Sequence, residues 1–210
     1  MLLSDKNAAI GIGSLIIFIA MILVAGIAAS VIIQTMNILE QQALNTGQET
    51  LKDVSGGLRV THVSGLKSGS TIDQIAIFIK TTAGSFDMDL SESFISLSDS
   101  TTKLILNYTS NCYSDSVSSG LFGTLDASNL SASTYGIMKI RDIDSSCSSG
   151  NPVINDDDLV VLLVNTTKCF SGLNTRTEVN GKVIPEQGLN GIISFITPSA
   201  YVDIIIELQN

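Results

Sequence analysis

Hydrophobic residues divide the chain into an apolar first segment and a longer segment of mixed pattern. No charged side chain occurs between Asn7 and Leu39, and residues 8–33 are almost entirely apolar. A helix needs about 20 such residues to cross a bilayer. Because large apolar side chains occur in every direction around it, the pattern predicts a helix that is buried on all sides, in lipid or in protein.

A narrower apolar stripe extends this helix beyond Gln34. Leu44, Gly47, Leu51, Val54 and Leu58 follow 3,4 spacing and so lie on one helix face. We expect a helix from about Ala9 to Ser55 that ends at the Gly56-Gly57 pair. Such a helix is about 70 Å long, more than twice the thickness of the hydrocarbon core of a bilayer. The side chains expected to make assembly contacts are Ile12, Leu15, Ile16, Ile19, Ile22, Leu23, Ile27, Val31, Leu44, Leu51, Val54 and Leu58.

After Leu58 the apolar period changes to two, which is typical of strands. Strands are expected at 58–63, 72–80, 86–90, 94–97, 103–108, 135–141, 159–165, 175–179, 182–185, 192–197 and 201–208. The Asn180-Gly181 pair predicts a type I′ hairpin turn between two of them. Residues 109–134 and 142–158, rich in Ser, Asn and Gly, are expected to form exposed loops. The predicted fold class is α+β: a long N-terminal hydrophobic α-helix followed by an immunoglobulin-like antiparallel β-sandwich, residues 58–210, called the head below.

Charge and residue usage narrow the classes of function. The net charge is −9, and every charged residue except Asp5 and Lys6 lies at or after Glu40. An acidic head argues against a nucleic-acid partner, because phosphates are bound by Lys and Arg. His62 is the only histidine, and no phosphate-binding glycine loop follows a strand and opens a helix. We therefore expect no catalytic site and no cofactor.

Cys112, Cys147 and Cys169 form no CxxC pair, which argues against a metal knuckle or a redox motif. In an extracytoplasmic head two of them can pair, and Cys112 with Cys147 is the pairing we predict. The alternative is three buried, reduced side chains that act as small hydrophobic residues.

Carboxylates gather in one part of the predicted loops. Asp156, Asp157 and Asp158 precede a strand, and Asp142 and Asp144 alternate nearby in the sequence. Such side chains can hold a structural divalent cation such as Ca²⁺ or Mg²⁺. No EF-hand spacing supports this interpretation, and a solvated loop is the simpler one.

Three glycosylation sequons begin at Asn107, Asn129 and Asn165. Chance alone predicts roughly three for a chain this rich in Asn, Ser and Thr, so their value depends on an extracytoplasmic head. Asn129, in a predicted loop, is expected to be the most accessible.

Both ends of the chain resemble one protein family. The run from Ala9 to Ala25, AIGIGSLIIFIAMILVA, is similar to the N-terminus of archaellins, the archaeal flagellins related to type IV pilins. The segments Arg176-Thr177-Glu178-Val179 and Pro185-Glu186-Gln187-Gly188, with Thr197-Pro198-Ser199 and Ile206-Glu207-Leu208-Gln209, resemble the C-terminal strands of that family. Together these segments cover about a third of the chain.

The resemblance implies a structural subunit of the archaeal flagellum, the archaellum, that serves swimming motility and has no enzymatic activity. The precursor would lie in the cell membrane. A prepilin-type signal peptidase would remove the leader, residues 1–8, between Ala8 and Ala9. The family usually has Gly before the cut and more basic residues upstream, whereas this chain has Lys6, Asn7 and Ala8, so a cut after Asn7 is the alternative. A membrane assembly motor would add subunits to an extracellular filament, as a homopolymer or as a mixed polymer with other archaellins. The helix, residues 9–57, would form its core.

Two other functions share parts of this pattern. An adhesive type IV-like pilus subunit has the same helix but not the C-terminal match, and bacterial pilins usually carry Glu where Gly13 would stand in the mature chain. A membrane-anchored extracellular binding domain needs only a single span, so the stripe after Leu44 argues against it. Exposing the fifteen large apolar side chains of residues 10–33 to water would cost roughly 20–45 kcal/mol. The mature chain is therefore expected in membrane or in polymer.

Overall fold

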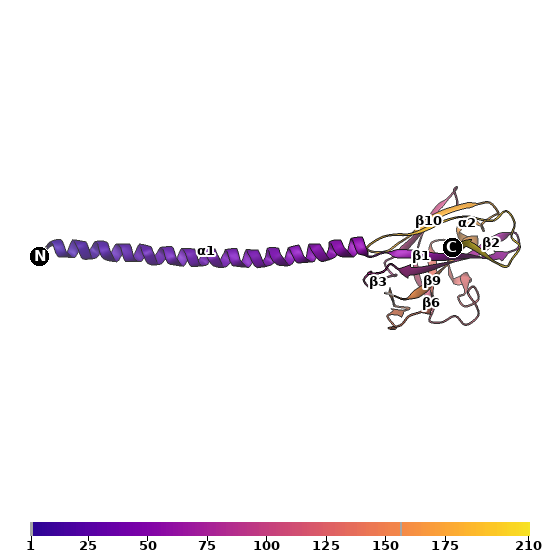
Figure 1. Ribbon diagram of the computed structural model, residues 1–210, viewed down its shortest axis with the longest axis horizontal. Helices are drawn as coiled ribbons and strands as arrows, with labels where there is room; N and C mark the ends of the chain where they lie inside the picture. Colours follow the sequence, from indigo (N-terminus) through magenta and orange to yellow (C-terminus); the bar gives the residue numbers. More distant parts are fainter. Residues whose placement is uncertain (1, 156) are drawn as a thin grey trace. The chain divides into compact units, whose positions relative to one another are not determined.

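A computed structural model describes residues 2–155 and 157–210 (Figure 1). The chain forms two compact units, residues 1–49 and Thr50–Asn210, and each is described by itself. The predicted fold class is confirmed, since a long apolar helix precedes a mostly β head.

The helix α1 spans Leu2–Ser55 without interruption. Its predicted end at Ser55 is confirmed, and the two following glycines are buried. A Cβ on Gly57 would lie only 2.7 Å from the Cβ of Leu189, with which Gly57 forms an isolated parallel bridge. The helix thus ends where the backbone passes very close to the loop that contains Leu189. Glycine has no Cβ and therefore permits this approach.

The head holds twelve strands, a short helix and a 3₁₀ turn in its described residues. They are β1 (Leu58–Ser68), β2 (Thr71–Thr81), β3 (Met88–Asp89), β4 (Phe94–Ser98), β5 (Lys103–Ser114), η1 (Ala127–Asn129), β6 (Thr134–Arg141), β7 (Cys147–Ser148), β8 (Asn151–Ile154), β9 (Leu159–Asn165), α2 (Thr166–Phe170), β10 (Glu178–Ile184), β11 (Gly191–Ile196) and β12 (Ile205–Gln209). Nine form one sheet in the order β11-β10-β4-β5-β6-β9-β2-β1-β12, and β3, β8 and β7 form a small second sheet. All pairs are antiparallel except β5 with β6.

The large sheet curves until its two edge strands nearly meet. The side-chain amide of Gln209, on β12, donates to the carbonyl of Ile192 at 3.1 Å and accepts from the amide of Ser194 at 2.8 Å. The amide of Leu58 donates to the carbonyl of Leu189 at 2.9 Å. The predicted sandwich therefore takes the form of one nearly closed, barrel-like sheet whose interior is the core.

Two apolar clusters lie on opposite sides of this sheet. The inner cluster includes Ile75, Leu97, Ile137 and Val183, all fully buried. The buried hydroxyl of Tyr135 also lies there and donates to the carbonyls of Leu90 and Ser93 at 2.9 and 3.0 Å, so its polar group is satisfied. The outer cluster contains Ala76, Cys112, Leu125, Leu130, Met138, Val161 and Leu163. It forms where the segment around η1 covers the outside of β2, β6 and β9.

The predicted hairpin at Asn180-Gly181 is wrong, because both residues lie inside the continuous strand β10. Gly181 pairs with Leu97 on one side and Ile193 on the other. A Cβ on Gly181 would lie 2.5 Å from the carbonyl oxygen of Ser96. The glycine serves close strand packing rather than a turn.

Some strand limits also differ from those expected. The loop predicted at 109–134 begins later, because β5 runs to Ser114, and the loop at 142–158 contains β7 and β8. The strand expected at 86–90 is reduced to Met88–Asp89, and the last strand starts at Ile205. These limits depend on pairing with distant segments: β8, for example, pairs with β3.

The predicted Cys112–Cys147 disulfide is wrong, since all three cysteines are free. Cys112 belongs to the outer cluster and Cys147 to the inner one, so the sheet separates them. Burial raises the pKa of the Cys112 thiol, helped by the nearby Asp126 carboxylate, to about 11. Burial also raises the pKa of Cys169 to about 11. The alternative of unpaired cysteines is the one that the structure supports.

Leu58 does not belong to the helix stripe, which corrects its predicted assembly role. It is the first residue of β1 and is only 2% exposed, packed in the inner cluster. The 3,4 spacing continues by coincidence past the two glycines that end α1, because the chain changes conformation there.

Candidate functional site

The described side chains of α1 are uncovered. Residues 11–55 are exposed throughout, and the large apolar ones among them include Ile12, Leu15, Ile16, Ile19, Ile22, Leu23, Ile27 and Val31. The helix region Gly11–Ser55 is long and apolar enough to cross a membrane, with a mean hydropathy of 3.0 over its most apolar window. Such a surface is stable only against lipid or other apolar protein surfaces.

The stripe beyond the apolar run is equally uncovered. Leu44, Leu51 and Val54 are 61, 64 and 71% exposed. Gly47, between them in the sequence, has open space where a Cβ would be. The polar residues between the stripe positions face other directions, so this part of α1 has one apolar face available to another helix.

Small residues create a shallow apolar groove on the first half of α1. Ala20, Ala25 and Ala28 line it together with Ile17, Met21 and Val24. Small side chains let two helices approach closely in an apolar environment, where van der Waals contact drives association. The groove is therefore suited to helix–helix packing.

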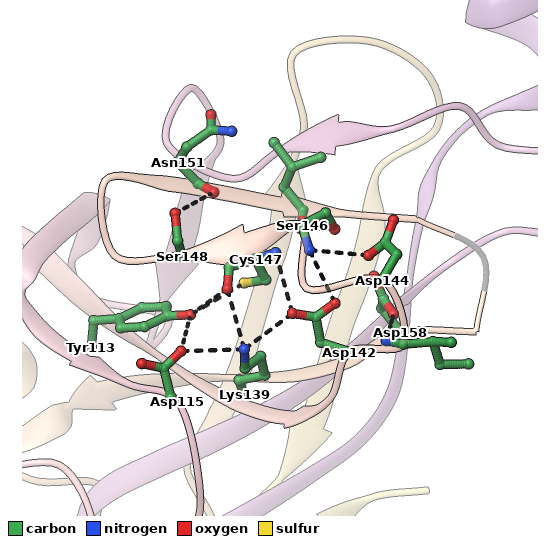
Figure 2. A network of polar contacts seen from close by, with 12 residues as sticks. Tyr113, Asp115, Lys139, Asp142, Asp144, Ser146, Cys147, Ser148, Asn151 and Asp158 are labelled. Atoms are coloured by element: carbon green, nitrogen blue, oxygen red, sulfur yellow. Dashed lines mark hydrogen bonds and ion pairs between the residues drawn. The ribbon is translucent and has the colours of Figure 1, made fainter.

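Three carboxylates converge at one edge of the sheet in the head (Figure 2). Asp142 and Asp144 follow β6, and Asp158 precedes β9. Because β6 and β9 are antiparallel neighbours, the end of one meets the start of the other. Ligand oxygens of the three side chains lie within 4.8 Å of one another. Asp144 is exposed, whereas the side chains of Asp142 and Asp158 are buried.

Backbone amides hold each carboxylate in place. Asp142 accepts from Ser146 and Cys147, at 3.3 Å each. The amide of Ser146 also donates to Asp144, at 3.0 Å. Asp158 accepts from Ile143 at 3.3 Å and Asn155 at 3.0 Å. Carboxylate oxygens fixed in this way are the ligand type that Ca²⁺ prefers.

The ammonium group of Lys139 balances part of the negative charge of these carboxylates. Figure 2 shows the ammonium of Lys139 paired with Asp142 and with Asp115. The N–O distances of these ion pairs are 3.1 and 3.2 Å. Burial lowers the pKa of Lys139, but its hydrogen bonds and ion pairs with the two carboxylates outweigh burial and leave it raised. Hydrogen bonds from Ser146 and Asn155 lower the pKa of Asp144. The carboxylates thus outnumber the ammonium groups paired with them.

The carboxylates that converge in the structure are not the three consecutive aspartates, 156–158, that the sequence predicts as metal ligands. Asp158 joins Asp142 and Asp144, whereas Asp157 is paired with Arg141 at 3.5 Å. Asp156 lies outside the described residues. The sequence signal for the cluster was the alternation of Asp142 and Asp144, and the antiparallel pairing of β6 and β9 supplies the third member.

The sequons differ in accessibility. Asn107, on β5, and Asn129, in η1, are exposed. Asn165 is only 8% exposed, which contradicts its predicted role as a glycan acceptor. Its amide nitrogen donates to the carbonyl of Ala127 at 2.9 Å, and its oxygen accepts from the amide of Lys168 at 3.1 Å as the N-cap of α2.

The remaining predicted sites are located as follows. Ala8 and Ala9, which flank the predicted cut, lie within α1, and their side chains are outside the described part of the structure. His62 is partly buried and contacts the ring of Phe78 edge-on, with centroids 5.5 Å apart. This contact gives His62 a packing role.

Exposed apolar residues on the head were missed at the sequence level. Ile105, Ile192 and Ile196 lie on strands, and Val202 and Ile204 lie in the loop before β12. The sequence predicts a strand at 192–197, in which large apolar residues stand at neighbouring positions, as Ile192 and Ile193 do. The second apolar face was the signal that could have revealed this surface.

Comparison with known proteins identifies a matching family model and several relatives of this chain. The family model for archaeal-type flagellin matches residues 8–195. Flagellin B2 of Methanocaldococcus jannaschii is 43% identical over 99% of this chain and 97% of its own length. Flagellin B1 of Methanococcus voltae is 40% identical over the same shares.

Solved structures agree with these relatives. The crystal structure of archaeal flagellin FlaB1 from Methanocaldococcus jannaschii is 35% identical, covers 74% of this chain and 98% of its own, and has a TM-score of 0.68. The archaeal flagellum of Methanospirillum hungatei strain JF1 shares the fold, with a TM-score of 0.65 at 14% identity and coverage of 95 and 99%. Because the family model and relatives of 40% identity or more span nearly the whole chain, the chain belongs to the archaeal-type flagellin family.

Proposed function

We propose that this flagellin polymerises through α1 into the core of an extracellular filament, with the heads on the outside. As an archaeal flagellin it is a structural subunit of the archaeal flagellum. The observation that carries the proposed polymerisation mode is the uncovered apolar surface of α1 over residues 11–55.

Energetics support a transfer from membrane to polymer. The large apolar side chains of residues 10–33 would cost roughly 20–45 kcal/mol if exposed to water, an upper bound. Lipid covers them in the precursor, and neighbouring copies of α1 cover them in the filament. A head-to-tail contact that is repeated from each subunit to the next produces an open helical filament when its rotation does not close into a ring.

Maturation belongs to the same proposal. A prepilin-type signal peptidase removes residues 1–8 by cutting between Ala8 and Ala9, with a cut after Asn7 as the alternative. A membrane assembly motor then adds the subunit to a homopolymer or to a mixed polymer with other flagellins. The resemblance of residues 9–25 to the family N-terminus supports this order of events.

A charge in the apolar stripe tests the polymer contact. Leu51→Glu should abolish filaments, because a carboxylate would be buried against the neighbouring helix. Gln42→Glu, about half a turn away around the helix, is the matched control and should still assemble. Negative-stain imaging of sheared surface material and circular dichroism of the head report assembly and folding separately. Normal filaments from Leu51→Glu chains with folded heads would contradict the stripe as a contact.

We also propose that Asp142, Asp144 and Asp158 hold a structural divalent cation. Their convergence within 4.8 Å, with two of the three side chains buried, supports it. Calcium added to EDTA-treated protein should raise the melting temperature of the wild-type head and leave that of Asp158→Asn unchanged. An equal shift in Asp157→Asn and wild type is expected, since Asp157 pairs with Arg141 instead. A wild-type melting temperature that does not change on addition of calcium would refute the proposed cation site.

A further inference from the structure

The outer face of the head is covered on only one half of its sheet. Segment 115–133 packs over β2, β6 and β9 and buries the outer cluster there. Strands β5, β4, β10 and β11 have their inner side chains in the core. The outer side chains of β5, β10 and β11 remain largely exposed, and those of β4 are half-buried. Among these, Ile105, Ile192 and Ile196 are 57, 63 and 66% exposed.

Register aligns these side chains in rows across the four strands. One row runs from β11 to β5. Ile192 pairs with Lys182, Lys182 pairs with Ser96, and Ser96 pairs with Ile105. The next row is Ser194, Asn180, Ser98 and Lys103. We call the outer side chains of these two rows the sheet face. A shallow hollow of about 510 Å³ lies on it, between the isoleucine of β11 and the lysines.

The sheet face carries two ammonium groups in an acidic chain, and the carboxylate of Glu178 flanks it on β10, where it accepts from the side-chain amide of Asn180 at 2.9 Å. Lys103 and Lys182 are its charged members, and both are exposed, whereas the chain has a net charge of −9. An apolar surface flanked by two ammonium groups is complementary to an apolar surface that carries carboxylates.

A second exposed apolar surface has that composition. Val202 and Ile204, 85 and 72% exposed, are the two most exposed large apolar residues in the described chain, and Asp203 lies between them. We call residues 202–205 the loop tip. Ile205 and Glu207 continue the pattern on β12, both exposed.

Hydrogen bonds fix the backbone next to and within the loop tip. The ammonium of Lys67 donates to the carbonyl of Tyr201 at 2.7 Å, and the hydroxyl of Tyr201 donates to the carbonyl of Leu173 at 3.1 Å. The amide of Lys67 donates to the carbonyl of Ile204 at 2.8 Å. The head therefore fixes the backbone on both sides of Val202 and presents its side chain outward, which lowers the entropy cost of binding.

We propose that the loop tip of one subunit docks on the sheet face of a neighbouring copy in the filament, with Val202 and Ile204 against Ile105 and Ile192 and with Asp203 near Lys182. This inference rests on the proposed polymerisation. The two surfaces differ in charge, so the contact is between unlike patches, which is the type that propagates through an open helical polymer.

Cysteine crosslinking tests the contact directly in assembled filaments. Ile192→Cys with Val202→Cys should form disulfides between subunits under oxidation and give a ladder of multimers on a non-reducing gel. Ile143→Cys with Val202→Cys is the matched control, because Ile143 is 69% exposed but lies on another loop. The wild-type chain, with its own three cysteines, measures the background.

Charge exchange provides a second measurement that does not depend on new thiols. Lys182→Glu and Asp203→Lys should each lower the temperature at which filaments dissociate, and the double variant should recover towards the wild type. A ladder no stronger than the control, or single variants whose filaments dissociate at the wild-type temperature, would overturn the docking contact while filaments still form. Absence of filaments from the wild-type chain would instead overturn the proposed polymerisation.

Discussion

The role of an individual residue in the head depends on which residues lie next to it in the fold. Asn165 heads a sequon and yet caps α2, with both ends of its side-chain amide hydrogen-bonded. Asn129 heads a sequon of the same type and is exposed in η1. The same local signal therefore leads to a structural residue at one position and an accessible one at the other.

Replacing Asn165 should reveal this structural role. Asn165→Ala removes the N-cap of α2 and the hydrogen bond to Ala127, so we expect the head to lose about 1–2 kcal/mol of unfolding free energy. Asn129→Ala should change it by less than about 0.5 kcal/mol. Urea unfolding followed by circular dichroism measures both. Equal effects of the two substitutions would contradict the capping role.

Asp144 should contribute to the acid sensitivity of the head. Its folded pKa is lowered by the hydrogen bonds of Ser146 and Asn155, so the unfolded state binds the proton more tightly. Its stabilisation is therefore present above the unfolded pKa, near 3.9, and is lost as pH falls through the folded pKa. Asp144→Asn should lose less stability than the wild type between pH 6 and pH 3. Parallel curves of unfolding free energy against pH would exclude this contribution.

Among the elements, β10 shows how strand packing overrides a turn signal. Asn180 and Gly181 form a strong hairpin signal in the sequence, yet both pair on two sides within the sheet. The side chain of Asn180 accepts from the hydroxyl of Ser194 at 2.9 Å and donates to Glu178 at 2.9 Å. Glu178 lies on β10 itself, whereas the contact with Ser194 exists only once β11 flanks the strand.

Gly181→Val should therefore destabilise the head although valine favours strands. The new side chain would meet the carbonyl of Ser96 and the side chain of Leu97, and overpacking of this type costs about 1–3 kcal/mol. Gly150→Ala is the control, because a Cβ at Gly150 would have nothing within 4 Å. Thermal unfolding of both variants measures the difference. A Gly181→Val head as stable as the wild type would show that β4 can move aside.

The full chain combines an insoluble segment with a head that has its own core. The unit Thr50–Asn210 contains both apolar clusters, and the described part of residues 1–49 has its apolar side chains exposed. The head therefore has the internal contacts that a separately folding domain needs.

A chain that starts at Thr50 should be a soluble monomer with a cooperative thermal transition. The chain that starts at Ala9 should require detergent, membrane or polymer, because its helix cannot remain in water. Light scattering coupled to size-exclusion chromatography distinguishes the two. Polymers of the shortened chain under the same conditions would assign assembly to the head instead of to α1.

The sequence alone was sufficient for features that depend on local pattern. The uncharged run after Asn7, the stripe at Leu44 and Leu51, and the end of the helix at Ser55 follow from spacing and from two glycines, because a helix is stabilised by contacts three and four residues apart. The β character of the head and the family resemblance follow from the same kind of local information.

Tertiary structure alone decided which side of the sheet each residue occupies. Cys112 and Cys147 lie in different clusters, Leu58 turns from the helix into the core, and Asp158 rather than Asp157 joins Asp142. Each outcome depends on a strand partner far away in the sequence, and a period of two does not say which of its two faces is buried, or by what. The uncovered sheet face and the loop tip emerge only from that pairing.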